Sequence, residues 1–285
     1  GMMDVLRSDS DLKCEEGVDC RNYGVLDGIR EAKQLLADMM EVPIDNVVIF
    51  GNSSLNIMYD TVARSMTHGV MGSTPWCKLD KVKFLCPVPG YDRHFAITEH
   101  FGIEMIIIPM HDDGPDMDMV EQLVNTDPAV KGIWCVPKYS NPQGITYSDE
   151  TVLRFARLKP AAEDFRIYWD NAYSIHHLYD DNQDFLVEIL EACAKAGNPD
   201  LVYKFTSTSK VSFPGSGIAA VAASKANLED FRSYMQIQTI GHDKLNQLRH
   251  VKFFKNIDGL HEHMRKHAAI LRPKFEMVLT TLDRE

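Results

Sequence analysis

The sequence lacks the features that would assign it to a membrane-spanning or nucleic-acid-binding class. The longest apolar runs, at 105–110 and 218–223, fall well short of the roughly 18 residues of a membrane-spanning helix. Lys and Arg form no cluster, and the net charge of −11 would repel a nucleic-acid backbone. We therefore expect no membrane span and no nucleic-acid partner.

The sequence also lacks the cysteine spacing and the leader typical of exported proteins. Its six cysteines include no Cys-x-x-Cys pair, and Cys86 and Cys135 lie in apolar runs where a reduced thiol packs as a small hydrophobe. Gly1-Met2-Met3 resembles an expression remnant, and the residues after it are acidic and polar, unlike an export signal. These features favour a cytoplasmic protein.

The pattern of apolar residues predicts an α/β fold. The chain has 285 residues, of which 45% are hydrophobic, enough for one large core. Short β-branched runs alternate with longer helical periods, as in parallel strands joined by crossover helices. We predict a mainly parallel seven-stranded sheet with helices on both faces. The predicted strands are 46–50, 83–87, 104–108, 132–136, 166–169, 201–205 and 217–223. The predicted helices are 27–40, 55–68, 92–101, 117–125, 149–157, 184–196 and 228–237.

The pattern becomes purely helical beyond Gly241, with one long amphipathic helix predicted at 259–282. We expect an amino-terminal segment at 1–21, a large domain at 22–240 and, at 241–285, helices that begin a smaller domain. The charged run at 111–116 is interpreted as a solvated turn.

Four polar residues match the needs of one cofactor. Asp170 closes a predicted strand and Lys210 follows another, at the carboxyl ends where open α/β sheets bind ligands. Tyr173 lies just after Asp170, and Asn141 precedes Pro142 in a turn. Pyridoxal phosphate (PLP) requires a lysine that forms an imine, an acid at the pyridine nitrogen, and an amide and a phenol at the ring oxygen. Taken singly, these residues also suit an exposed lysine, a turn cap, a core-edge tyrosine and a turn asparagine.

The sequence also offers a place for the phosphate. Residues 51–55, Gly-Asn-Ser-Ser-Leu, join a strand to a helix, so backbone amides and the helix dipole form an anion site there. Ser207 and Ser209 flank Lys210 and could donate hydrogen bonds to the same phosphate. Tyr91 follows another strand end, from which its ring could stack on a planar cofactor.

With these residues, the chain from Asn22 to Leu282 resembles the fold type I PLP-dependent enzymes. Within them it is most similar to the class I aminotransferases, in an aspartate aminotransferase-like subgroup. The resemblance implies an aminotransferase that moves an amino group from an L-amino acid, aspartate or another acidic one, to a 2-oxo acid. The motifs that carry it are 140–144 (Ser-Asn-Pro-Gln-Gly), 170–173 (Asp-Asn-Ala-Tyr) and 207–210 (Ser-Thr-Ser-Lys).

The resemblance also implies a role for each residue. Lys210 would form the imine with PLP and move the proton of the substrate α-carbon, while Asp170 would pair with the pyridine nitrogen. Asn141 and Tyr173 would contact the ring oxygen, and Tyr91 would stack on the ring. Tyr23 is similar to a family tyrosine that reaches the partner subunit's phosphate, so a homodimer with shared active sites is implied. The phosphate-binding set would be Ser53, Ser54, Leu55, Ser207 and Ser209.

Two features depart from the family pattern. Many relatives place a phosphate-neutralising arginine where this chain has Ile218. The family's small domain and its substrate-binding arginine would lie after Glu285, so we expect the chain to be a fragment of a longer enzyme. The alternatives left open are a PLP-binding regulatory or inactive fragment of the same fold, and a PLP-dependent lyase.

Two other motifs point to different chemistry and are not favoured. Ser207-x-x-Lys210 matches the Ser-x-x-Lys pattern of penicillin-binding enzymes, but the motif order is reversed and no Lys-Thr-Gly follows. His263 and His267 are spaced as a metal pair on one helix face, although an exposed helix explains them better. We therefore expect no metal.

Overall fold

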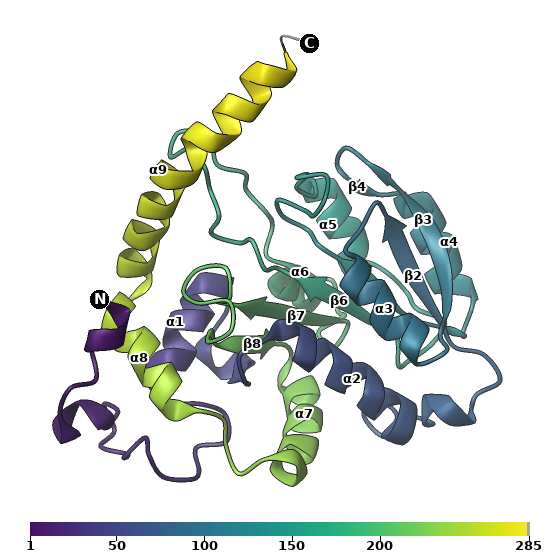
Figure 1. Cartoon of the computed structure of the whole chain (residues 1–285). Helices are drawn as coiled ribbons and strands as arrows, with labels where there is room; N and C mark the ends of the chain where they lie inside the picture. Colours follow the sequence, from purple (N-terminus) through teal and green to yellow (C-terminus); the bar gives the residue numbers. More distant parts are fainter. Residues whose placement is uncertain (284–285) are drawn as a thin grey trace.

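The computed structural model describes residues 1–283, which form an eight-stranded sheet in the order β1-β8-β7-β6-β5-β2-β3-β4 (Figure 1). Strands β7, β6, β5, β2 and β3 pair in parallel. Strand β8 runs antiparallel to both of its neighbours, β1 and β7. The strands are β1 (Val47–Ile49), β2 (Lys83–Val88), β3 (Glu104–His111), β4 (Gly114–Pro115), β5 (Val130–Cys135), β6 (Arg166–Asp170), β7 (Val202–Ser207) and β8 (Ala219–Ala222).

Helices cover both faces of this sheet, as predicted (Figure 1). One buried cluster joins the sheet to α1, α4, α5, α6 and α8, and a second joins the opposite face to α2, α3 and α7. The helices are α1 (Arg30–Met40), α2 (Ser54–His68), α3 (Asp92–His100), α4 (Met117–Thr126), α5 (Asp149–Ala156), α6 (Ile189–Lys195), α7 (Lys225–Gln238), α8 (Lys244–Phe254) and α9 (Ile257–Leu282). Short 3-10 helices are η1 (Met2–Asp4), η2 (Asp9–Leu12), η3 (Ile44–Asn46) and η4 (Trp76–Lys78).

The structure has one strand more than the seven predicted. This strand, β4, lies in the charged run at 111–116, which the sequence analysis interpreted as a solvated turn. Met110 of β3 pairs with Pro115 of β4, so the run folds back on the sheet edge as a short hairpin. Gly114 makes this possible, because its φ of +139° is unfavourable for other residues and a Cβ there would lie 2.7 Å from the Thr151 side chain.

The helix predicted at 184–196 is shorter than expected. It begins at Ile189, because the Glu188 carboxylate caps it by accepting from the backbone amides of Leu190 (2.8 Å) and Glu191 (2.6 Å). Upstream, Asp184 is committed to other contacts: its amide donates to the Tyr139 hydroxyl at 2.9 Å. The helical periodicity of the sequence therefore begins upstream of Ile189, where the helix itself begins.

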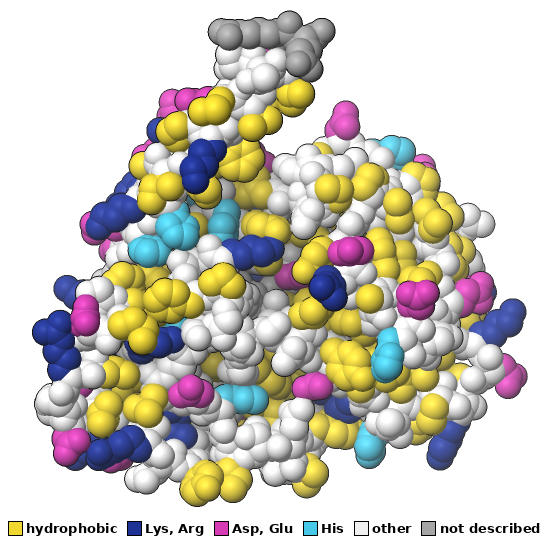
Figure 2. All heavy atoms as spheres, in the orientation of Figure 1, with side chains coloured by type: hydrophobic (Ala, Val, Ile, Leu, Met, Phe, Trp, Pro, Cys, Tyr) yellow, Lys and Arg dark blue, Asp and Glu magenta, His cyan; other side chains and the backbone are white. Residues whose placement is uncertain are grey.

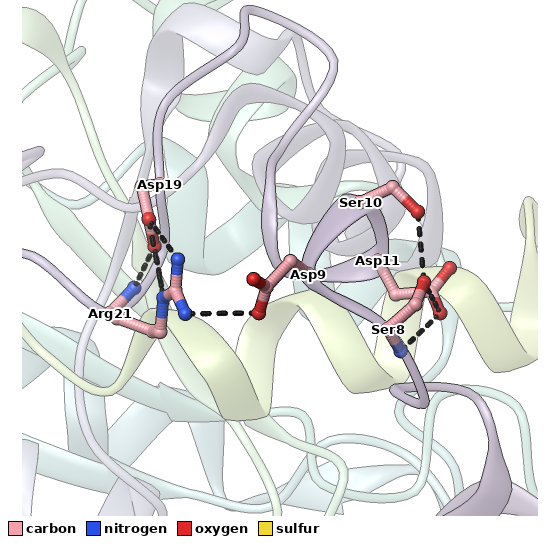
Figure 3. Close-up of polar contacts among 6 residues, drawn as sticks. All are labelled: Ser8, Asp9, Ser10, Asp11, Asp19 and Arg21. Atoms are coloured by element: carbon pink, nitrogen blue, oxygen red, sulfur yellow. Dashed lines mark hydrogen bonds and ion pairs between the residues drawn. The ribbon is translucent and has the colours of Figure 1, made fainter.

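The amino-terminal segment is held by a small polar network (Figure 3). Arg21 donates to Asp19 (Nη2 to Oδ2, 2.7 Å) and to Asp9 (Nη1 to Oδ1, 3.2 Å), and Ser8 Oγ donates to Asp11 at 2.8 Å. These exposed contacts add little stability singly, but together they tie η2 to the chain just before Tyr23.

The last helix, α9, projects away from the body of the molecule (Figure 1). Apolar side chains line its projecting part (Figure 2). The exposed ones are Ile270, Leu271, Phe275, Met277, Val278, Leu279 and Leu282. No helix within residues 1–283 combines the length and the apolar character needed to cross a bilayer.

Candidate active site

The site is built around Asp170, the last residue of β6. Its side chain is buried, and its Oδ2 lies 2.8 Å from Nε2 of His94 on α3. Its Oδ1 is also buried and has no hydrogen-bond partner among the described residues. An unpaired buried oxygen costs about 1–3 kcal/mol unless another donor reaches it. Asp170 therefore has a place for one more donor, which fits the protonated pyridine nitrogen of PLP.

His94 is a site residue that the sequence reasoning missed. Its ring stacks on Trp134 of β5 (centroids 4.8 Å apart, planes at 15°), and Tyr91 meets its edge at 5.0 Å. These contacts fix the imidazole so that Nε2 faces the Asp170 carboxylate. The sequence did contain a signal that could have identified His94. It follows Tyr91 by three residues at the start of a helix, a spacing that places the two side chains next to each other.

Lys210 and Tyr173, which the sequence analysis assigned to one site, are in direct contact. Lys210 lies exposed in the loop between β7 and β8, and Tyr173 lies in the loop after β6. The Lys210 amine donates a hydrogen bond to the Tyr173 hydroxyl, and Nζ lies 3.9 Å from the centre of the Tyr173 ring. The phenol is therefore placed to hold and orient the amine.

The proposed phosphate-binding residues converge at the start of α2. Ser54 is the first helical residue, and the Ser53 side chain makes no capping hydrogen bond, so the first-turn amides lack that partner. Ser209 Oγ donates to the Asn52 carbonyl at 3.1 Å, and Ser207 Oγ donates to Ser209 Oγ at 3.3 Å. Leu55 lies in the same first turn and offers its amide. The two loops thus form one cradle.

The remaining predicted residues, Tyr91, Asn141 and Tyr23, lie in different places. Tyr91 and Asn141 line the same small cavity, together with His94 and Trp134. Tyr23 is 85% exposed, and within residues 1–283 no hydrogen bond or ion pair joins it to the other site residues. The structure therefore shows three local groups, Lys210 with Tyr173, Ser207 and Ser209 with the Asn52 loop, and Tyr91 and Asn141 at the cavity beside His94, and it leaves Tyr23 facing outward.

Ile218 supplies no charge to the cradle. Its side chain is buried in the core, and its amide donates to Thr208 Oγ1 at 2.9 Å. Arg249 of α8 lines a cavity of about 620 Å³ together with Asn52 and Ile218, and its Nη2 donates to the Ser216 carbonyl at 3.3 Å. The Arg249 guanidinium, from α8, therefore lies at the same cavity as Asn52 of the cradle.

Two imidazoles lie near the lysine loop, the segment 208–218 between β7 and β8, and both are held neutral by burial. Burial lowers the pKa of His176 to about 4, and it lowers the pKa of His250 to about 4 as well. His250 Nε2 lies 2.7 Å from Ser212 Oγ, and the His176 ring meets the Tyr173 ring edge-on at 5.5 Å. Within the described part of the chain, no group of His, Cys, Asp and Glu side chains could hold a metal ion.

Comparison with known proteins identifies the family. A family model described as aspartate amino-transferase matches residues 1–285. The chain belongs to this family. It is 46% identical over 280 residues to the aspartate aminotransferase of Corynebacterium glutamicum, covering 98% of this chain and 64% of that protein. The chain thus spans less than two thirds of the length of that curated relative.

Solved structures agree with this assignment. A crystal structure of an aspartate transaminase from Corynebacterium glutamicum matches with a TM-score of 0.95 at 45% identity, over 99% of this chain and 66% of that one. A protein from Corynebacterium diphtheriae described as a putative aminotransferase matches with a TM-score of 0.92 at 50% identity, over 96% of this chain and 67% of that one. The expected α/β fold of the PLP-dependent aminotransferases is confirmed.

More distant structures share the fold alone. LysN, an α-aminoadipate aminotransferase from Thermus thermophilus, matches with a TM-score of 0.75 at 20% identity, over 100% of this chain and 66% of that one. That protein was solved in complex with N-(5'-phosphopyridoxyl)-L-leucine, a PLP–amino acid adduct. The arrangement of sheet and helices is therefore preserved where most of the sequence has changed.

Proposed function

We propose that this chain forms the PLP-binding part of an aminotransferase that moves an amino group from an L-amino acid to a 2-oxo acid. The observation that carries the proposal is the placement of the Lys210–Tyr173 pair near the carboxyl edge of a sheet where Asp170 keeps one buried oxygen free. The family match and the named relative support the same reaction class.

PLP, when bound, supplies an electron sink for the substrate's α-carbon electrons. Asp170 would use its free Oδ1 to hold the pyridine nitrogen protonated, while His94 keeps the carboxylate oriented through Oδ2. Tyr91 would stack on the ring. Asn141 and Tyr173 would donate to the ring oxygen, and Tyr173 already contacts the lysine amine.

Lys210 would serve as the group that carries the proton. With PLP and substrate bound, its amine Nζ would be the base that takes the proton of the substrate α-carbon and the acid that gives the proton up again at the cofactor. The hydrogen bond to Tyr173 would hold Nζ within reach of both positions.

Phosphate binding would fall to the cradle of Ser53, Ser54, Leu55, Ser207 and Ser209, in which neutral donors and the α2 dipole stabilise the charge. Tyr23 would add a donor from the partner subunit, because it faces outward here and the network around Arg21 fixes its base. A homodimer with shared sites is therefore part of the proposal.

We further propose an acidic amino donor, aspartate above all, and a cytoplasmic location. The support for the donor is the resemblance at the lysine motif and the activity named for the relative from Corynebacterium glutamicum. The support for the location is the set of free cysteines, of which Cys14, Cys20, Cys86, Cys135 and Cys193 are buried as ordinary apolar side chains.

The deciding experiment is an absorbance spectrum of the purified protein with added PLP, recorded before and after addition of aspartate. We expect a band of lysine-bound cofactor that is absent from Lys210→Ala and that converts to the amine form with aspartate. A Lys210-dependent band that no amino acid changes would favour the binding-only alternative. If no band depends on Lys210, the proposal is wrong.

A further inference from the structure

Two histidines contact consecutive backbone carbonyls of the lysine loop from different elements. His176, in the loop after β6, places Nε2 3.4 Å from the Lys210 carbonyl oxygen. His263, on α9, places Nε2 3.0 Å from the Val211 carbonyl oxygen. The first is a long hydrogen bond and the second an ordinary one. The backbone of the lysine loop is therefore held on two sides.

Both rings are fixed by aromatic neighbours. The His176 ring meets the Tyr173 ring at 5.5 Å with planes at 80°, so one imidazole contacts both the lysine backbone and the phenol that binds the lysine amine. The His263 ring packs against Phe253 at 5.7 Å and Phe254 at 5.2 Å. Rings held in this way lose little further freedom when they donate a hydrogen bond.

The tautomer of His176 follows from its surroundings. Nε2 faces a carbonyl, which accepts only, while Nδ1 is buried without a partner among the described residues. The proton therefore belongs on Nε2. The charged or titratable groups near this ring are Tyr173, Lys210, His267 and His177. Burial above all, with the charges of Lys210, His267 and His177, lowers the pKa of His176 to about 4, so the ring is a neutral donor near pH 7.

We propose that His176 and His263 are positioning residues for Lys210: together they hold the Lys210 and Val211 carbonyls and so fix the lysine amine against Tyr173. His176 acts on both members of the Lys210–Tyr173 pair, and His263 fastens the same loop to α9. This assigns a structural task to His263, which the sequence interpretation left on an exposed helix face. The proposal rests on the proposed function, since positioning matters only if Lys210 reacts.

The first test uses cofactor-free protein and hydrogen exchange of the segment 208–216. His176→Leu and His263→Leu each remove a donor, and we expect exchange there to accelerate about fivefold, the effect of one lost hydrogen bond. His176→Gln and His263→Gln keep a donor at a similar reach and should restore slow exchange. His261→Leu is the matched control, because it removes an imidazole of the same helix α9 that, within residues 1–283, makes no hydrogen bond to this loop and no ring contact with His176 or His263.

The second test uses the PLP-loaded protein. In the Leu variants we expect kcat to fall about tenfold with little change in KM, because a loosened loop misplaces the proton carrier without altering substrate contacts. The pH midpoint of the lysine-bound absorbance band should rise by about 0.5–1 unit as the Tyr173 contact weakens, and the Gln variants should reverse both changes. If a Leu variant fails to fold, the other Leu variant and the Gln pair still decide the question.

The two proposals fail in distinguishable ways. A lysine-bound band and normal turnover that persist in both folded Leu variants, with unchanged exchange, would overturn the positioning role and leave the aminotransferase assignment intact. The other outcome is a protein that never forms a Lys210-dependent band, although exchange accelerates in the Leu variants and recovers in the Gln variants. That result would overturn the proposed function, and the two histidines would then hold the loop without serving catalysis.

Discussion

The two carboxylate oxygens of Asp170 have different surroundings: Oδ2 lies 2.8 Å from His94 Nε2, while Oδ1 is buried and can accept from one further donor. Because His94 is itself locked between Trp134 and Tyr91, the orientation of the acid is set before any ligand arrives. A site prepared in this way would bind a cationic ring without rearranging its own side chains.

The first prediction concerns this pair. His94→Phe keeps a ring beside Trp134 but removes the donor to Asp170, so both carboxylate oxygens would be left unpaired. We expect the free energy of unfolding of the cofactor-free protein to fall by about 1–3 kcal/mol and PLP affinity to fall about tenfold. Urea unfolding and fluorescence titration measure these. His100→Phe, at the exposed end of the same helix, should change neither.

The second prediction concerns the phenol that binds the lysine. Tyr173→Phe retains the ring but removes the hydroxyl that accepts from Lys210. We expect kcat to fall at least about tenfold while KM for the amino donor changes less than about threefold, because the lost contact acts on the proton carrier. Tyr179→Phe, whose hydroxyl contacts Glu276 instead, is the control. Equal kinetics for both variants would contradict the assigned role.

The third prediction separates the phosphate from the ring. Ser209→Ala removes a hydroxyl from the cradle that joins Ser207 to the Asn52 loop. We expect the Kd for PLP to rise about fivefold to tenfold, and the Kd for pyridoxal, which has no phosphate, to stay unchanged. Ser212→Ala in the same loop, whose hydroxyl contacts His250, is the control. Weaker binding of both ligands would indicate a general distortion of the loop.

The fourth prediction tests whether subunits share sites through Tyr23. Tyr23→Ala and Lys210→Ala should each be nearly inactive alone. Mixing them should restore activity, because a mixed dimer combines an intact Lys210 in one subunit with an intact Tyr23 from the other. Activity is measured after the mixture has been allowed to exchange subunits, and sedimentation confirms the dimer. No recovery in a mixture that does form mixed dimers would place Tyr23 outside the site.

The fifth prediction concerns stability in acid. Burial lowers the pKa of His250 from its usual 6.5 to about 4, so between these values the unfolded chain binds a proton that the folded chain does not. The free energy of unfolding should therefore fall with falling pH, by about 1.4 kcal/mol per pH unit for this group. Urea unfolding at several pH values between 4 and 6.5, which bracket the shift, should show a shallower slope for His250→Gln. His68→Gln, on an exposed helix end, should keep the original slope.

Much of the fold could be predicted because burial on both faces leaves a clear mark on strands. Residues 166–169 and 201–205 are nearly continuous apolar runs, and both became central strands. The strand β4 could not be predicted, because two residues carry no periodic pattern and Gly114 and Pro115 are ordinary turn residues. The start of α6 was misplaced because the cap at Glu188 is a local contact that periodicity does not reveal.

The candidate site was predictable where residues follow strand ends and not where they meet across elements. Asp170, Tyr173 and Lys210 could be proposed from the sequence because strand ends converge in any such sheet. His94 was missed because its contact with Asp170 joins α3 to β6, two elements far apart in the chain. The same holds for His263, whose contact with Val211 depends on the path of α9.

The position of β8 has a consequence for how the protein is made. This strand lies between β7 and β1, so β1 joins the sheet only through a strand that reaches residue 222. A nascent chain that has left the ribosome only as far as Lys210 has both loops of the cradle, but the Ser209–Asn52 hydrogen bond would have to join them without the strand that connects β1 to β7. Under the proposed function, capture of the cofactor during translation would therefore follow the insertion of this last strand.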